Sequence, residues 1–214
     1  ALCRTPAGPL QVDLGRCLFC GACSSACPAH AIAYDRDHRL STSTRNDLVL
    51  SGDQPLQLAR AMEKKIHRLL GRSLKLRQVS AGGCNACEAD VNVLGTVGWD
   101  LGRFGIQFVA SPRHADGILV TGPVTQNMAY ALRNTYDAIT TPKLVIVVGS
   151  CAISGGLFRD NPETLSGLHD IPIDLYIPRR PPPPPPPPHR PLPPPPPPPT
   201  TTPPPPTLPP PPPP

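Results

Sequence analysis

Residues 143–149 read KLVIVVG, a continuous apolar run that ends in a glycine. Such a run, bounded by turn residues, predicts a strand that is buried on both faces. The other predicted elements are strands at LKLRQV (74–79), IQFVA (106–110) and GILVT (117–121), and helices over 89–101 and 127–139. Alternating strands and helices with apolar strands predict an α/β domain, a small flavodoxin-like parallel sheet covered on both faces.

Three glycine-containing loops follow these strands at their carboxyl ends. They are GGCNACE after the first strand, GPVTQN after the third and GSCAISGG after the last. Loops at the carboxyl ends of parallel strands form the functional edge of such a sheet. The sequence therefore predicts that Cys84, Cys87 and Cys151 lie on one edge.

The sequence predicts four parts. Residues 1–40 are a short, loop-like, cysteine-rich segment, residues 74–178 are the sheet domain, and residues 41–73 join them as a polar linker and a helix. The helix has apolar residues at helical spacing, so it either packs on the next domain or lies on a membrane surface. Residues 179–214 are almost entirely proline and are predicted to be a disordered tail.

Composition excludes several classes of protein. The net charge of +5 comes partly from Arg179, Arg180 and Arg190 in the tail, and aromatic residues make up 4% of the chain. A nucleic-acid-binding protein needs a basic stripe or aromatic stacking platforms, and neither is present, so no nucleic-acid partner is expected. We expect no secretory leader, because the opening ALCRTPAGPL lacks a basic stretch followed by an apolar one, and the longest apolar run, Leu144 to Val148, is too short to span a bilayer.

The first cysteine motif is Cys17-x2-Cys20-x2-Cys23-x3-Cys27, followed by proline. Zinc sites usually use two separated cysteine pairs, so zinc is the weaker interpretation. The motif resembles that of bacterial ferredoxin-type 4Fe–4S domains, over about residues 1–40. In that pattern three cysteines bind one cluster and the cysteine before proline points to a neighbouring one.

The resemblance also suggests that the ferredoxin-type segment is truncated. If Ala1-Leu2 corresponds to Ala31-Ile32, the cysteine that completes the cluster of Cys17, Cys20 and Cys23 would lie four residues before Ala1. Cys27 or Cys3 could take its place, although Cys3 is equally well explained as a plain thiol.

The second cysteine motif comprises Cys84 and Cys87, with Cys151 on the parallel edge. By itself C-x-x-C at a strand-to-helix turn could be a thioredoxin-like redox pair. Together with GPVT (122–125) and GSCAISGG (149–156), it resembles the electron-transfer subunit shared by nickel–iron hydrogenases and NADH-quinone oxidoreductase, the complex I 20 kDa subunit family. The C-x-x-C spacing follows the hydrogenase small subunits.

This resemblance implies a function. Cys84, Cys87 and Cys151 would be three of the four ligands of a second 4Fe–4S cluster, beside a large catalytic subunit. The chain would be an iron–sulfur electron-transfer subunit of a complex-I-like oxidoreductase or membrane-bound hydrogenase. Its partners would be the large subunit and other iron–sulfur subunits. It would lie in the cytoplasm, on the inner face of the cell membrane, through those partners.

The fourth ligand of the family lies in a Pro-Gly-Cys-Pro-Pro turn after a strand. Here the predicted strand IDLYI (173–177) is followed by Pro178, Arg179, Arg180 and prolines. Arginine cannot ligate iron, so the resemblance leaves the second cluster without a fourth ligand. We therefore interpret the sequence after Pro178 as a reading-frame error. The alternative is a genuine proline-rich extension.

No catalytic residue is expected in this chain, because no nucleophile–base pair or nucleotide fingerprint is present. Glu88 could relay protons beside the second cluster, or it could simply be an exposed residue stabilised by the helix dipole. The alternative function is that of a truncated fragment with one cluster or none. Such a fragment would act only as a binding module, with a tail that docks into aromatic grooves.

Overall fold

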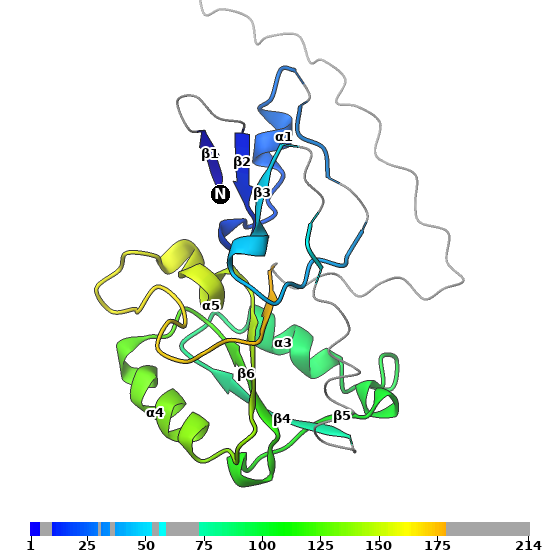
Figure 1. The fold of residues 1–214 in the computed structure, drawn as a ribbon, viewed down its shortest axis with the longest axis vertical. Helices are drawn as coiled ribbons and strands as arrows, with labels where there is room; N and C mark the ends of the chain where they lie inside the picture. The colour runs from blue at the N-terminus through cyan, green and yellow to red at the C-terminus, as the bar shows by residue number, and fades with distance from the viewer. Residues whose placement is uncertain (5–9, 30, 35–36, 53–55, 59–72, 179–214) are drawn as a thin grey trace, which may run out of the picture. The chain divides into compact units, whose positions relative to one another are not determined.

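The computed structural model describes residues 1–4, 10–29, 31–34, 37–52, 56–58 and 73–178, and a five-stranded parallel sheet forms its centre (Figure 1). Its strands are β4 (Leu74–Ser80), β5 (Ile106–Phe108), β6 (Gly117–Thr121), β7 (Leu144–Val148) and β8 (Leu175–Ile177). Their order is β5-β4-β6-β7-β8, which is the 2-1-3-4-5 order of flavodoxin-like folds. The predicted fold class is confirmed.

The central strands are buried on both faces, as their apolar runs predicted. Side chains alternate along β6, so Ile118 and Val120 enter one core and Leu119 enters the other. In the register with β7, Gly117 stands opposite Leu144. A Cβ atom at Gly117 would lie 2.5 Å from the Leu144 carbonyl oxygen, so this close approach requires glycine.

Helices cover both faces of the sheet (Figure 1). They are α3 (Ala86–Val93), α4 (Gln126–Asp137) and α5 (Ser150–Ser154). Val91 of α3 packs with Leu119, whereas Leu132 of α4 and Ile153 of α5 belong to the opposite core.

The helix predicted over 89–101 is shorter than expected and begins earlier. It ends at Val93, and turns then lead to a 3-10 helix at Leu101–Phe104. Gly95 and Gly98 lie in these turns, in line with the low helix propensity of glycine.

The N-terminal segment is an antiparallel sheet with short helices, not a set of loops. Its elements are β1 (Leu2–Arg4), β2 (Leu10–Asp13), η1 (Leu14–Arg16), α1 (Ala22–Ser25), η2 (Asn46–Leu48) and β3 (Val49–Ser51). β3 lies within the stretch predicted to be a polar linker, and it pairs with β2. Thr42 also exchanges two backbone hydrogen bonds of 3.0 and 2.9 Å with Tyr176 of β8.

Two of the predicted features fall mainly outside the described residues. The amphipathic helix was expected over residues 56–70, of which 59–70 lie outside the described ranges, and the proline-rich tail at 179–214 lies wholly outside them. Within the described ranges, no helix combines the length and the apolar character needed to cross a bilayer. The domain boundaries inferred from the sequence stay predictions.

Candidate iron–sulfur sites

The first cysteine motif is anchored by the chain that leads into it. The Asp13 carboxylate caps η1 by accepting a 2.9 Å hydrogen bond from the Gly15 amide. The same carboxylate accepts a 2.7 Å hydrogen bond from Arg45 Nη2. Cys17 follows η1 directly and is buried, so its position is fixed by the fold. Phe19 and Gly21 then adopt positive φ angles of 52° and 77°, which allow the chain to turn tightly between cysteines.

Three residues of the described segment, Phe19, Ala31 and Tyr34, form hydrogen bonds with sulfurs of this motif. The Phe19 amide donates to Cys17 Sγ at 3.3 Å, and the Ala31 amide donates to Cys27 Sγ at 3.4 Å. The Tyr34 hydroxyl lies 3.3 Å from Cys23 Sγ. Hydrogen bonds to ligand sulfurs set the reduction potential of iron–sulfur clusters, so these donors suit a cluster site.

Tyr34 interacts electrostatically with three of the four cysteines of the first motif. Its pKa is raised to about 12, first by the hydrogen bond with Cys23, then by burial, and then by the charges of Cys17, Cys23 and Cys20. These are the three cysteines predicted to share a cluster. The sequence analysis did not identify Tyr34, because no motif spacing points to it.

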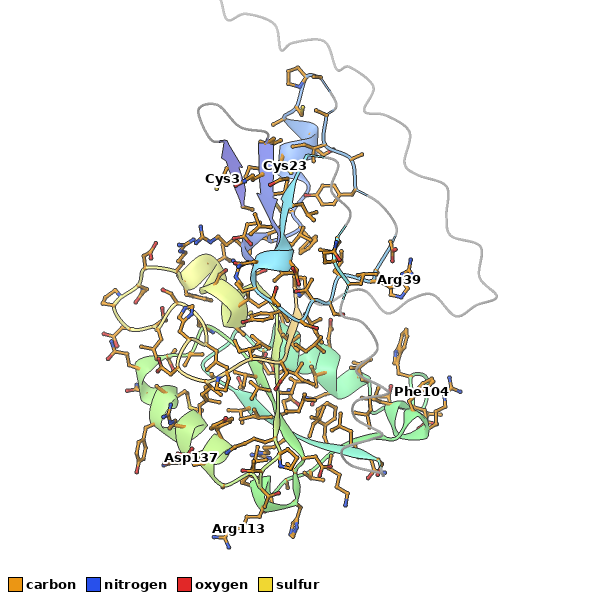
Figure 2. The ribbon with its side chains drawn as sticks, in the orientation of Figure 1. Cys3, Cys23, Arg39, Phe104, Arg113 and Asp137 are labelled. Carbon is orange, nitrogen blue, oxygen red and sulfur yellow. The ribbon has the colours of Figure 1, made fainter. Side chains whose placement is uncertain are left out.

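Cys3 is the other cysteine of the N-terminal segment. It lies exposed on β1, whereas Cys23 comes from α1 (Figure 2). Completion of the first cluster by Cys3 or by Cys27 stays a prediction.

The second cysteine motif begins where β4 ends beside β6. Gly122 has a φ of +85°, and a Cβ atom there would lie 2.6 Å from the Gly83 amide nitrogen. The two glycine loops therefore cross in direct backbone contact, which no other residue type allows. Cys84 is exposed at this crossing and Cys87 lies in the first turn of α3.

Cys87 interacts electrostatically with both other cysteines of the second motif. Burial is the main cause that raises the pKa of Cys87 to about 11, followed by the charges of Glu88, Cys151 and Cys84. Cys151 lies in the first turn of α5, and a Cβ atom at Gly156 would come within 2.7 Å of its sulfur. Glycine therefore keeps space beside this sulfur.

In the described part of the chain, no three His, Cys, Asp or Glu side chains are gathered closely enough to hold a single metal ion. A four-iron cluster is bound differently, because each cysteine ligates a different iron atom. That Cys84, Cys87 and Cys151 ligate such a cluster stays a prediction. The fourth position predicted from the family, at residues 179–180, lies outside the described residues.

Glu88 is buried, with 6% of its surface exposed. Its Oε1 accepts hydrogen bonds from Ser80 Oγ at 2.6 Å and Thr121 Oγ1 at 2.7 Å. Burial opposes ionisation, but the two hydrogen bonds outweigh it and lower the pKa of Glu88. Glu88 thus ties α3 to the ends of β4 and β6, and it is not the exposed helix-start residue considered above. The proton relay stays a prediction.

The first motif packs directly on the helix that carries Cys151. Ser150 Oγ donates a 2.6 Å hydrogen bond to the carbonyl oxygen of Cys17. One turn later, Ser154 Oγ donates a 2.8 Å hydrogen bond to the carbonyl oxygen of Gly15. Cysteines from the two motifs are therefore connected through α5.

Comparison with known proteins places this arrangement in a family. The chain matches the family model "NADH ubiquinone oxidoreductase, 20 Kd subunit" over residues 84–186 and the model "4Fe-4S binding domain" over residues 10–33. It is 39% identical over 124 residues to a Pyrococcus furiosus protein named "Probable membrane-bound hydrogenase subunit mbhJ". That match covers 56% of this chain and 74% of the relative. The chain belongs to the NADH ubiquinone oxidoreductase 20 Kd subunit family.

Two further relatives within the 20 Kd subunit family carry different names. The chain is 44% identical over 99 residues to an NADH-quinone oxidoreductase subunit of Bacteroides fragilis, a match that covers 45% of this chain and 50% of that protein. It is 38% identical over 122 residues to formate hydrogenlyase subunit 7 of Escherichia coli, which covers 56% of this chain and 48% of the relative. The chain thus spans about half the length of these two relatives. Both predicted resemblances, to this family and to ferredoxin-type domains, are confirmed.

Proposed function

We propose that this chain is an iron–sulfur electron-transfer subunit of a multisubunit oxidoreductase, either complex-I-like or a membrane-bound hydrogenase. The observation that carries the proposal is the connection of two cysteine motifs through one short helix, α5. When bound, 4Fe–4S clusters supply one-electron redox chemistry. The chain itself holds the thiolates, buries them and donates hydrogen bonds to their sulfurs.

At the first site, Cys17, Cys20 and Cys23 would hold a 4Fe–4S cluster. The Phe19 amide and the Tyr34 hydroxyl are placed to donate to its ligand sulfurs. At the second site, Cys84, Cys87 and Cys151 would supply three of the four ligands. The catalytic centre belongs to a partner, since neither site contains a nucleophile–base pair.

The partner surface that we propose surrounds Cys151. Leu157 and Phe158 follow the glycine beside its sulfur and are 64% and 40% exposed, and Leu165 is 38% exposed. Exposed apolar side chains next to a redox site are typical of a surface that a partner covers. The occupant would be the large catalytic subunit, with an interface above about 1,000 Å². Through that complex, the chain would sit on the cytoplasmic face of a membrane.

Iron analysis tests the proposal most directly. Protein prepared anaerobically should contain iron and acid-labile sulfide in equal amounts, and reduction should produce the electron paramagnetic resonance (EPR) signal of a 4Fe–4S cluster. Protein that folds but binds no iron would support the alternative, a cluster-free binding module. Co-expression with a candidate large catalytic subunit, followed by a pull-down, tests the partner. Replacing Leu157 and Phe158 with serine should weaken that interaction without loss of iron.

A further inference from the structure

The contact between Ser150 and Cys17 joins residues that are 133 positions apart in the sequence. Ser150 is 3% exposed, and its hydroxyl donates its 2.6 Å hydrogen bond to a backbone carbonyl of the first motif. Buried carbonyl groups require a donor, and here that donor comes from the residue immediately before Cys151. The two candidate cluster sites are thus linked by one side chain.

A second contact reinforces the first. Ser154 is also buried, and its hydroxyl is shared between the Gly15 carbonyl at 2.8 Å and the Ser150 carbonyl of its own helix at 3.2 Å. A Cβ atom at Gly15 would lie 2.9 Å from Ile153 Cγ2, so η1 packs closely against α5. The 2.7 Å ion pair of Arg45 with Asp13 also holds η1, and the Arg45 guanidinium would lie 2.8 Å from the same Cβ position at Gly15. Movement of the Cys17 backbone would therefore disturb α5.

The hydrogen-bond acceptor of Ser150 lies outside its own helix. Ser150 is the first residue of α5, so no preceding turn of that helix offers its hydroxyl a carbonyl, and the hydroxyl donates to the Cys17 carbonyl of another segment. This geometry makes the orientation of Cys17 depend on the helix that carries Cys151.

We propose that Ser150 is a positioning residue that couples the first iron–sulfur site to α5, and hence to the Cys151 turn of the second site. The inference rests on the proposed function, because it requires a cluster at the first motif. Coupling between sites is reciprocal, so a coupling in which the intact α5 helps to position Cys17 also requires that a cluster at the first site stabilises α5. Loading of the first site should therefore slow local opening of α5.

Hydrogen exchange on the full chain measures this coupling. Peptides that cover α5 would be followed under anaerobic conditions, before and after reconstitution with iron and sulfide. The amides of Ile153 and Gly155 report on the helix, since they donate to the carbonyls of Gly149 and Cys151. We expect reconstitution to slow their exchange several-fold in the natural chain.

Three variants separate coupling from general stability. Ser150→Ala should bind iron, but reconstitution should slow hydrogen exchange in α5 much less than in the natural chain. Ser150→Thr keeps a hydroxyl and should show the same slowing of exchange as the natural chain. Thr135→Ala is the matched control, because it removes a hydroxyl that donates at 2.8 Å to the Ala131 carbonyl within α4. This control should leave the slowing unchanged.

The reduction potential of the first cluster gives an independent reading. Removal of the Ser150 hydroxyl leaves the negative end of the Cys17 carbonyl dipole uncompensated near the cluster, so Ser150→Ala should lower the potential. The potentials of Ser150→Thr and Thr135→Ala should stay close to that of the natural chain. If Ser150→Ala does not fold, Ser154→Ala replaces it and should weaken the slowing partially.

The outcomes distinguish a failure of the proposed function from a failure of the proposed coupling. A natural chain that binds no iron contradicts the proposed function. A natural chain that binds iron without slowing exchange in α5 contradicts the coupling alone. A folded Ser150→Ala or Ser154→Ala variant in which reconstitution slows exchange in α5 as much as in the natural chain also overturns the role assigned to these serine contacts, whatever its iron content.

Discussion

The Tyr34 hydroxyl lies 3.3 Å from the sulfur of Cys23. A cysteine bound to iron has lost its proton, so in the loaded protein Tyr34 would be the donor and Cys23 the acceptor. Hydrogen bonds to ligand sulfurs stabilise the more negative, reduced form of a cluster. Tyr34 therefore adds a specific control on the potential of the first site.

Tyr34→Phe should lower the reduction potential of the first cluster without loss of iron, because only the hydroxyl is removed. A redox titration followed by EPR measures the shift. The control is Tyr130→Phe, on α4, where the side chain is 77% exposed. Equal potentials for the natural chain and Tyr34→Phe would show that the hydroxyl does not act on the cluster.

Cys20→Ser should strongly reduce the iron bound at the first site, or leave a three-iron form, because it removes one of the grouped thiols. Iron and sulfide analysis of anaerobic protein measures this loss. Cys3→Ser distinguishes the two candidates for the fourth ligand: it should leave the iron content unchanged where Cys27 completes the cluster and lower it where Cys3 does. Unchanged iron in Cys20→Ser would show that the first site is assigned wrongly.

Replacing Arg179 with glycine and Arg180 with cysteine recreates the Pro-Gly-Cys-Pro-Pro turn of the family. If Cys84, Cys87 and Cys151 lack only a fourth thiolate, this double variant should bind about four more iron atoms per chain, which corresponds to one further cluster. Arg190→Cys adds a thiol elsewhere in the tail and should not produce this gain.

The Arg179→Gly, Arg180→Cys variant also tests the three other ligands. Adding Cys151→Ser to it should abolish the gain, because the cluster again lacks a thiolate. A gain that survives Cys151→Ser would contradict the assignment of Cys151.

Glu88→Ala should destabilise the sheet domain, because it leaves the hydroxyls of Ser80 and Thr121 without their acceptor. The expected loss in the free energy of unfolding is about 1–3 kcal/mol, typical for buried polar groups left unpaired. Urea denaturation under reducing, iron-free conditions measures it. Glu163→Ala, at an exposed loop position, is the control and should change stability little. A loss in the free energy of unfolding no larger than that of the control would show that the hydrogen bonds of Glu88 with Ser80 and Thr121 do not stabilise the domain.

Gly122→Ala should disrupt the crossing of the two glycine loops. A methyl group would meet the Gly83 backbone at 2.6 Å, at a φ of +85° that side chains disfavour. Strain of this kind costs on the order of 1–3 kcal/mol even before the clash is counted. Gly98→Ala is the control, since a Cβ atom there meets nothing within 4 Å. Urea denaturation of both variants measures the difference, and equal stabilities would contradict the close crossing.

The sequence by itself determined the features that depend on neighbouring residues. The apolar runs at 117–121 and 144–148 specified buried strands, since a central parallel strand needs apolar side chains on both faces. The spacing of the cysteines at 17–27 predicted the first cluster motif directly, whereas Cys84, Cys87 and Cys151 were assigned to a second site through the resemblance to the 20 Kd subunit family. Even there, the helix predicted over 89–101 was placed too late and too long.

Tertiary structure alone decided the contacts between distant segments. β3 was not predicted, because it lies in a polar stretch and gains its stability from pairing with β2 rather than from its own residue pattern. Glu88 is buried only because Ser80 and Thr121 meet it at the ends of two strands. The hydrogen bond from Ser150 to Cys17 depends on how η1 packs against α5, and long-range packing of this kind leaves no periodic signal in the sequence.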